Sequence, residues 1–358
     1  MMTEGSVPGV DDVPRLIRWL AANGVPGAAD LEAVRVIAGG RSNLTYGLDF
    51  PPPGGAAGPA VPRLVLRRPP LGHVLPTAHD MGREYRLLSA LHGTDVPVPR
   101  PVAFCQDPDV IGAPFYLMEH VDGLVLRTRQ DGANVTPGQA RELSGLLAGM
   151  LAAIHRVDAV SVGLGAFGRP DGYLRRQFAR WQRQWELSST REVPGYARLV
   201  ARLADGLPAE GEGTLVHGDF RVDNALVTLG PRPGIAAVVD WEMSTLGDPL
   251  ADLGLTLTYW ADPGDEEWLA VGVGATVTAS PGFLSRAEFA ARYAELTGRD
   301  LSGIGYYMAF ACFKLAAVLE GIHARFLQHK TVGEGFEHEG QAVPYLIERA
   351  HRMLDTAC

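Results

Sequence analysis

Three residues in the middle of the chain have the types and spacing that phosphoryl transfer requires. Asp219 is followed five positions later by Asn224, and Asp240 stands at the end of the apolar run 235–239. In the template for this chemistry, the first aspartate orients or deprotonates the attacking hydroxyl, and the asparagine and the later aspartate hold Mg²⁺. We therefore predict Asp219 as the catalytic residue, and Asn224 and Asp240 as metal ligands.

Short strands are predicted on both sides of these residues. Apolar runs indicate strands over 214–216, 225–228 and 235–239, with Gly230 and Pro231 as a turn between the last two. A loop held between such strands would present Asp219 and Asn224 from a rigid sheet, with Asp240 at a neighbouring strand end. His-Gly-Asp alone is an ordinary turn sequence, so the prediction rests on the conjunction of motif and strand context.

The first 120 residues are predicted to be rich in strands. An amphipathic helix is expected over 11–23 and a second helix over 81–92, with strands over 33–38, 44–48, 63–67, 98–102 and 114–118. The glycine-containing turn between the first two strands lies where backbone N–H groups would cover nucleotide phosphates. A plain hairpin turn explains this stretch equally well. The candidate phosphate-binding residues there are Gly40, Arg41, Ser42 and Asn43.

A phosphoryl-transfer site also needs a cation near the nucleotide phosphates. The strand over 63–67 ends on Arg67, and the following helix carries Glu84, so we predict that these two residues form a phosphate-positioning ion pair. The template has a lysine at this place, but arginine keeps its charge and binds phosphate oxygens with a planar fork. The alternative is a surface arginine before the Pro69-Pro70 turn.

Beyond residue 120 the chain is predicted to be mostly helical, with the polar segment 119–123 as the crossing between two lobes, 1–120 and 121–358. Asp248 should cap a helix that begins at Pro249. Asp252 lies among apolar neighbours and should brace the catalytic loop, because a buried carboxylate needs hydrogen bonds. Helices are expected over 139–155, 174–185, 249–260, 284–296, 306–327 and 343–354. The predicted fold class is α+β, with a small β-rich N-terminal lobe, a larger helical C-terminal lobe and the site expected at their junction.

Composition narrows the functional class. The net charge of −9 argues against a general nucleic-acid-binding protein. The three cysteines (Cys105, Cys312, Cys358) show no pairing pattern, which favours a reducing cytoplasm. The start of the chain has no signal-peptide pattern, and Lys314 and Glu320 interrupt the longest apolar run. We expect a cytoplasmic protein without nucleic-acid or membrane partners; nothing in the sequence indicates an oligomeric state.

Together these segments resemble the aminoglycoside phosphotransferase family, the small-molecule branch of the protein-kinase-like fold. The most specific phrases are HGDFRVDN over 217–224 and VDWEMSTLGDPLADL over 239–253. The resemblance implies a bilobal kinase-like fold that uses ATP and Mg²⁺. It assigns catalysis to Asp219, and it implies that the hinge backbone from Glu119 to Val121 meets adenine.

Three further phrases look closest to one branch of that family: GGRSNLTY over 39–46, LRRPP over 66–70 and LGAFGRP over 164–170. The branch is similar to the kinase domain that is fused to acyl-CoA dehydrogenases in animals and free-standing in bacteria. For this branch, the resemblance implies a hydroxylated acyl-CoA or a related hydroxy acid as the acceptor.

An arginine-rich stretch offers an independent indication of the acceptor. Six arginines lie between 169 and 191 in an otherwise acidic protein. A polycationic aminoglycoside would favour an acidic groove, whereas a CoA-type or phosphorylated substrate suits arginines. A solvated helix face explains these charges equally well. The candidate acceptor-binding residues are Arg176 and Arg180, with Glu242 from the later motif.

The sequence therefore predicts a phosphotransferase that uses ATP and Mg²⁺ and acts on a hydroxyl of a small molecule. One alternative is an O-phosphotransferase that inactivates an aminoglycoside or macrolide. The other is a nucleotide-binding pseudokinase, which Arg67 in place of lysine and the atypical glycine turn leave open. The sequence does not choose between ATP and GTP.

Overall fold

A computed structural model describes residues 7–37, 43–51, 63–71, 80–209, 211–328 and 339–356. The chain divides into two compact units, Met1–Gly123 with Ala236–Glu242, and Leu124–Ile235 with Met243–Cys358. The segment Ala236–Glu242 therefore belongs to the first unit, whereas it falls within the predicted C-terminal lobe, 121–358.

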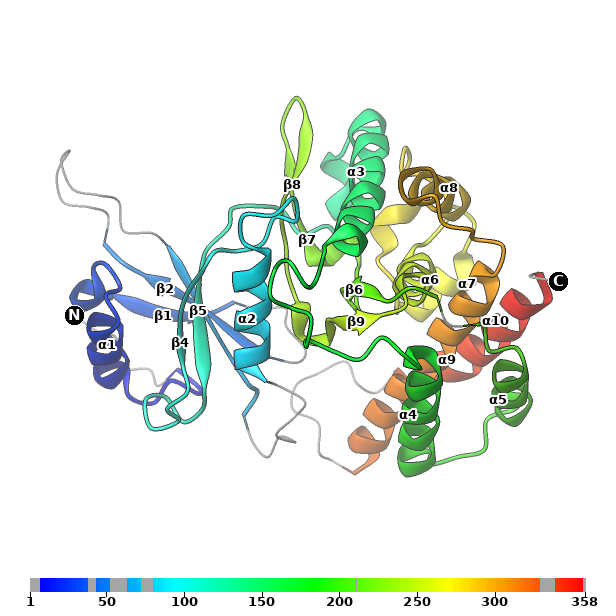
Figure 1. Ribbon diagram of the computed structural model, residues 1–358, viewed down its shortest axis with the longest axis horizontal. Coiled ribbons are helices and arrows are strands. Elements are labelled where there is room, and N and C mark those ends of the chain that lie inside the picture. The colour runs from blue at the N-terminus through cyan, green and yellow to red at the C-terminus, as the bar shows by residue number, and fades with distance from the viewer. Residues whose placement is uncertain are drawn as a thin grey trace. The chain divides into compact units, whose positions relative to one another are not determined.

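The first unit contains a five-stranded antiparallel sheet with the order β1-β2-β3-β5-β4 (Figure 1). Its register pairs Tyr46 with Leu66, and Leu66 with Leu117. The strands are β1 (Ala33–Val36), β2 (Leu44–Asp49), β3 (Leu64–Arg68), β4 (Pro101–Cys105) and β5 (Phe115–Glu119). The predicted hairpin and the predicted central strands are confirmed by this pairing.

The strand predicted over 98–102 is displaced, since β4 begins at Pro101. Prolines at 97, 99 and 101 alternate through this stretch and have no N–H to donate to a ladder. β4 lies at the sheet edge, where a proline is tolerated as the first residue of a strand.

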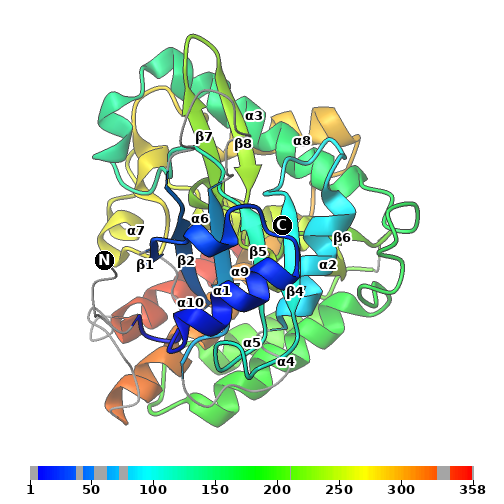
Figure 2. The ribbon, with the colours of Figure 1, turned by 90° about the vertical axis from the view of Figure 1, so that its left-hand side faces the viewer.

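Helices cover both faces of this sheet, α1 (Val13–Ala22) on one and α2 (Met81–Leu91) on the other (Figure 2). Leu16 and Leu20 of α1 pack with Leu66 and its neighbours on the first face. Because side chains alternate along a strand, Arg67 points to the opposite face, where it meets Glu84 of α2. The alternation of β3 thus places one charged side chain beneath α2.

The second unit is mainly helical, and the predicted helices are confirmed within a few residues at each end. α5 and α7 were not predicted; α7 is only six residues long, too short to show helical periodicity. The helices are α3 (Pro137–Arg156), α4 (Tyr173–Ser188), α5 (Tyr196–Asp205), α6 (Pro249–Tyr259), α7 (Glu266–Val271), α8 (Arg286–Thr297), α9 (Ile304–Leu327) and α10 (Ala342–Thr356). Short 3-10 helices lie at Ala28–Asp30, Asp131–Asn134, Val222–Asn224, Trp241–Met243, Thr276–Ala279 and Glu339–Gln341.

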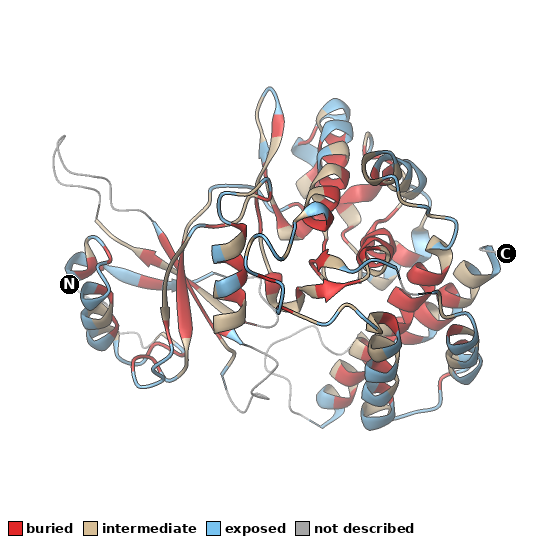
Figure 3. Cartoon of the chain, viewed as in Figure 1, coloured by how far each residue is buried: buried red, intermediate tan, exposed pale blue. Residues whose placement is uncertain are grey.

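α9 is the central helix of this unit and packs against α4, α6 and α10. It is buried over most of its length (Figure 3). Among the described helices, α9 is the one long and apolar enough to cross a membrane. However, 78% of its most apolar window is buried within the fold, as in the core helix of a globular unit.

Two small strand pairs frame the segment that carries the phosphoryl-transfer motif. β6 (Thr214–Val216) pairs with β9 (Thr245–Gly247), and β7 (Ala225–Leu229) pairs with β8 (Pro233–Val238). The strands predicted before and after the motif are confirmed, whereas β9 was missed because three residues carry no readable alternation. The fold class is α+β, as predicted.

Candidate active site

Hydrogen bonds to α6 hold the loop between β6 and β7. The backbone N–H groups of His217 and Gly218 donate to the two carboxylate oxygens of Asp252, at 2.6 and 2.9 Å. His155 Nε2 lies 3.2 Å from the same carboxylate. Burial alone would raise the pKa of Asp252, but His155 and the N–H of His217 hold that pKa below its ordinary value. The predicted bracing role of Asp252 is confirmed.

Two further contacts fix the shape of this loop. Thr256, one turn beyond Asp252, donates its hydroxyl to the carbonyl of Phe220 at 3.0 Å. Gly218 has a φ of 84°, and a Cβ at this position would lie 2.6 Å from the carbonyl oxygen of Met243. Only glycine satisfies both the left-handed backbone and this close approach.

Asp219 and Asn224 are brought together within this loop. The side-chain amide of Asn224 donates to the backbone oxygen of Asp219 at 2.9 Å and lies 3.3 Å from its Oδ2. Since the NH₂ group faces Asp219, the amide oxygen of Asn224 is the atom left to meet a cation. The N–H of Asp219 donates to Nδ1 of His217 at 3.3 Å, so His217 braces the backbone of this loop.

The loop also contains an ion pair that was not predicted, between Arg221 and Asp223. Arg221 binds Asp223 with two hydrogen bonds of 2.9 and 2.8 Å, and its guanidinium lies 4.3 Å from the ring centre of Tyr259. Burial, and then the negative charge of Asp219, raise the pKa of Tyr259. The guanidinium of Arg221 is therefore bound by Asp223 and Tyr259. The Arg-x-Asp spacing in the motif was the signal that could have revealed this pair.

The first unit contains the predicted phosphate-positioning pair. Nε of Arg67 lies 3.3 Å from Glu84 Oε2, and its Nη2 lies 2.5 Å from Asp240 Oδ1. Burial alone would lower the pKa of Arg67, but the carboxylates of Glu84 and Asp240 outweigh it and raise that pKa. Burial raises the pKa of Glu84, and the guanidinium of Arg67 opposes that shift. The ion pair is observed, and its phosphate-positioning role stays a prediction.

Asp240 has an unusual backbone conformation. Its φ is 67°, and within the described chain it is the non-glycine residue with a positive φ. The next residue, Trp241, is buried and donates its indole N–H to the carbonyl of Val238 at 2.9 Å, and Val238 N–H donates to Pro97 at 2.8 Å. These contacts hold Asp240 in a strained conformation of the kind that clusters at functional sites.

Asn43 and Glu242 join the group around Arg67. Asn43 is buried and donates its side-chain amide to Glu242 Oε2 at 2.7 Å, while Arg67 Nη2 lies 3.5 Å from the same oxygen. Glu242, predicted as an acceptor-binding residue, thus contacts the predicted nucleotide-binding residues. Gly40, Arg41 and Ser42 lie outside the described residues.

The predicted hinge lies at the end of β5. The backbone N–H of Glu119 donates to the carbonyl oxygen of Arg100 at 2.9 Å. The backbone N–H of His120 donates to the carbonyl oxygen of Arg63 at 2.8 Å. The side chain of Glu119 forms an ion pair with Arg100. Among the hydrogen bonds of the described residues, none uses the N–H of Val121, so this donor can meet a planar base at the strand end. The adenine-binding role of Glu119 and Val121 stays a prediction.

The two predicted acceptor arginines on α4 differ in their contacts. The guanidinium of Arg176 donates to the backbone oxygens of Arg169 and Asp171 at the start of its own helix. Arg180 is exposed, and its guanidinium lies 5.0 Å from the ring centre of Trp181. Of the two, Arg180 is the one whose guanidinium is not committed to the backbone.

The residues present suit a magnesium ion in donor chemistry. Mg²⁺ binds oxygen ligands and usually takes one or two protein carboxylates together with substrate phosphates. Asn224 offers its amide oxygen, and Asp240 offers the carboxylate oxygen that Arg67 does not bind. Among the described residues, no group of three or more His, Cys, Asp or Glu side chains is arranged to hold a metal ion.

Comparisons with known proteins find one family model and several curated relatives. A model of the phosphotransferase enzyme family matches residues 33–289. The acyl-CoA dehydrogenase family member 11 of Gallus gallus is 34% identical over 321 residues, which cover 88% of this chain and 40% of that protein. The chain thus spans about two fifths of the length of this curated relative.

Solved structures show the same fold. A crystal structure from Ralstonia eutropha, described as an aminoglycoside phosphotransferase, is 32% identical, has a TM-score of 0.78 and covers 96% of this chain and 98% of its own. The aminoglycoside phosphotransferase APH(4)-Ia, solved with ADP and hygromycin B, is 15% identical with a TM-score of 0.59, and covers 95% of this chain and 97% of its own. The similarity places the chain in the protein-kinase-like fold.

Proposed function

Because this chain belongs to the phosphotransferase enzyme family, and is therefore a small-molecule phosphotransferase, we propose that it phosphorylates a hydroxyl of a hydroxyacyl-CoA or hydroxy acid with ATP and Mg²⁺. The observation that carries the phosphotransferase assignment is the catalytic loop. There Asp219 and Asn224 are bonded to each other and the loop backbone is anchored on the buried Asp252.

The proposed reaction follows from the position of Asp219. Its carboxylate orients the acceptor hydroxyl and takes its proton as the new bond between oxygen and phosphorus forms and the bond to the leaving ADP breaks. Arg67, fixed by Glu84, would bind phosphate oxygens of the nucleotide. A Mg²⁺ held by Asn224 and Asp240 would neutralise charge on the phosphates. Because the transition state is loose, positioning and electrostatics supply most of the acceleration.

Two observations support the acyl acceptor. The curated relatives of this chain are named as members of an acyl-CoA dehydrogenase family, and the chain matches a part of them. In addition, the cation Arg180 lies on α4, a helix that packs on α9 within the unit that carries Asp219. Cations of this kind suit an acceptor with carboxylate or phosphate groups.

The free, buried thiols of Cys105 and Cys312 suit a reducing cytoplasm as the place of the reaction.

An aminoglycoside acceptor is the second candidate, because the solved structure at 32% identity is described as an aminoglycoside phosphotransferase. A polycationic aminosugar would be attracted by acidic side chains at the acceptor site and repelled by cations there. The two candidates therefore predict opposite responses when cations on α4 are removed.

The function is tested by incubating the chain with Mg·ATP and a panel of hydroxyacyl-CoAs, hydroxy acids and aminoglycosides, with mass spectrometry to detect phosphorylated products. We expect products from the acyl class, and Asp219→Asn should lower turnover by about 10²–10⁴, the range for a positioned general base. Asp205→Asn, an exposed change on α5, is the matched control. Products from aminoglycosides alone, or full activity in Asp219→Asn, would contradict the proposal.

A further inference from the structure

Lys314 is a cation on the central helix α9, beside the catalytic loop. Its neighbours in the chain, from Ala311 to Phe313 and from Leu315 to Ala317, are buried and apolar, whereas Lys314 itself is half-buried. The sequence signal for this residue is that Lys314 interrupts the longest apolar run of the chain. Removing a charged side chain from water in such a helix costs free energy unless hydrogen bonds or opposite charges compensate for the lost solvation.

The ammonium of Lys314 reaches the residue that precedes the catalytic aspartate. Nζ donates to the backbone oxygen of Gly218 at 3.0 Å. Burial lowers the pKa of Lys314, and the negative charges of Asp219 and Asp252 oppose that shift, so the ammonium lies in the field of both carboxylates. Within the described chain this bond to Gly218 is the hydrogen bond that Lys314 makes, while an ammonium has three donors.

α4 supplies the other wall around Lys314. Nζ lies 5.7 Å from the ring centre of Trp181, a buried side chain of α4, and Arg180 lies 5.0 Å from the same ring. Phe178 of α4 stacks on Phe313 of α9, with ring centres 5.6 Å apart, so the two helices are fixed against each other next to Lys314. Two cations from two packed helices are thus held on one indole ring.

Arg221, the arginine of the catalytic loop itself, is already paired and is not available to bind an anionic group of a ligand. Arg221 is bound by Asp223 with two hydrogen bonds and lies over Tyr259. Lys314 lies in the field of Asp219, and Arg180 lies by the same indole ring as Lys314; among the described residues neither cation has a carboxylate ion-pair partner of its own. A hydroxyl that reaches Asp219 brings the atoms next to it towards this pair.

We propose that Lys314, with Arg180, forms an oxyanion subsite that binds the acidic part of the acceptor and so selects anionic acceptors. The inference rests on the proposed phosphotransferase function and names the ligand chemistry of its acceptor site. The oxyanion comes from a carboxylate next to the reacting hydroxyl or from the phosphates of a CoA group. In either case Lys314 is a specificity-determining residue.

The test measures binding without turnover. Butyrate and butyryl-CoA lack the acyl hydroxyl and are titrated without ATP, so calorimetric titration of each reports on binding without turnover, and the Lys314 variants assign that binding to the subsite. We expect saturable binding of at least one. Lys314→Gln should weaken it by about tenfold to a hundredfold, the value of a hydrogen bond to a charged group. Butyrate binding would identify the carboxylate as the source, and binding of butyryl-CoA alone would identify the CoA group.

The variants separate recognition from support of the loop. Lys314→Gln keeps an N–H donor for Gly218 but loses the charge, and Lys314→Arg keeps the charge and should retain most of the affinity. Arg180→Gln alters an exposed residue, cannot disturb the core, and should also weaken binding. Arg325→Gln removes an exposed cation of the same helix and should leave binding unchanged.

Two results would overturn the subsite. One is the absence of binding of both probes to the unaltered chain, and the other is equal affinity in Lys314→Gln. Failure of the proposed function has a different signature, because no acceptor of the panel would then gain a phosphoryl group whatever these titrations show.

Discussion

Asp252 is buried in α6, and its two carboxylate oxygens accept N–H bonds from consecutive residues of the catalytic loop. An asparagine would keep one accepting oxygen and turn an NH₂ group towards the other loop N–H, leaving two donors face to face. Asp252→Asn should therefore lower the free energy of unfolding by about 2–4 kcal/mol, the range for breaking a buried charged network. Urea denaturation measures this loss, and an unchanged midpoint would contradict the bracing role.

The same residue predicts a dependence on pH. The folded chain holds the pKa of Asp252 below its ordinary value, so its contribution to stability is present above the unfolded pKa of about 4. That contribution is lost as the pH falls through the folded pKa, because the unfolded chain then binds the extra proton. The stability difference between the unaltered chain and Asp252→Asn should shrink between pH 5 and pH 3 (bounds set by that reference value of about 4). A difference that stays constant over this range would show that the carboxylate is not the source.

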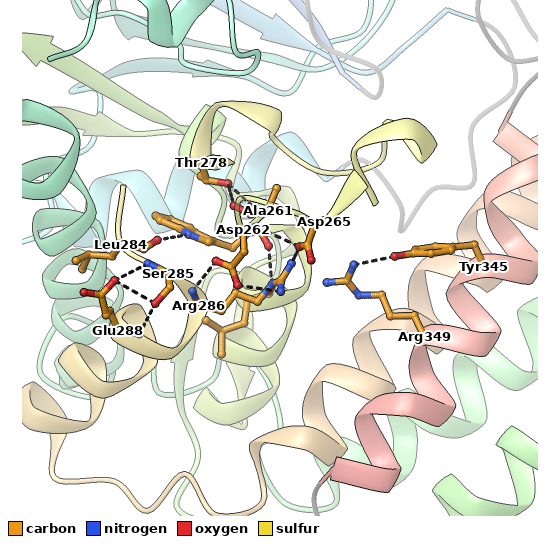
Figure 4. Close-up of polar contacts among 12 residues, drawn as sticks. Ala261, Asp262, Asp265, Thr278, Leu284, Ser285, Arg286, Glu288, Tyr345 and Arg349 are labelled. Carbon is orange, nitrogen blue, oxygen red and sulfur yellow. Dashed lines mark hydrogen bonds and ion pairs between the residues drawn. The ribbon is translucent and has the colours of Figure 1, made fainter. Parts of the chain in front are cut away.

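At the scale of elements, Arg286 attaches the start of α8 to the segment after α6 (Figure 4). Its guanidinium lies 3.1 Å from Asp262 Oδ2, forms an ion pair with Asp265, and donates to the carbonyl of Trp260 at 2.7 Å. Burial, and then the nearby charge of Arg349, lower the pKa of Arg286 to about 10. The arginine therefore stays charged at neutral pH and compensates two carboxylates.

Arg286→Met should destabilise the chain by about 3–5 kcal/mol, because it leaves two half-buried carboxylates without their cation. Arg292→Met is the matched control, since Arg292 lies on the same helix and its ion pair with Glu295 is exposed. The control should change stability by less than about 1 kcal/mol. Thermal unfolding of the two variants side by side checks the difference, and equal losses would refute the anchoring role.

Elements with a long repeating pattern were predictable from the sequence, and those defined by tertiary contacts were not. α3 and α9 have apolar residues at helical spacing over many turns, so their positions followed from the sequence. β9 has three residues and exists because β6 offers a partner. In the site, the motif predicted Asp219 and Asn224. Lys314 was missed because its role depends on Gly218, which only the fold brings close. Arg221 was missed although its partner Asp223 lies two positions away in the motif.

At the scale of the whole molecule, the first unit recruits a segment from late in the chain. Ala236–Glu242 carries the buried Trp241 and the carboxylate that binds Arg67, and it belongs to the unit formed by Met1–Gly123. The proposed metal ligands are consequently divided, with Asp240 in the first unit and Asn224 in the second.

The proposed roles of Asn224 and Asp240 as metal ligands predict how nucleotide and metal act on stability. A ligand that binds only the folded chain stabilises it by about 2.7 kcal/mol at a hundred times its Kd, so saturating Mg·ATP should raise the Tm by a few degrees. EDTA should remove the magnesium-dependent part of that shift, because Asn224 and Asp240 would then have no metal to hold. Asp240→Asn and Asn224→Ala should each abolish the magnesium-dependent part of the shift, whereas Asp205→Asn should keep it. A full magnesium-dependent shift in either variant would remove that residue from the metal site, and a full shift in both would place the nucleotide elsewhere on the molecule.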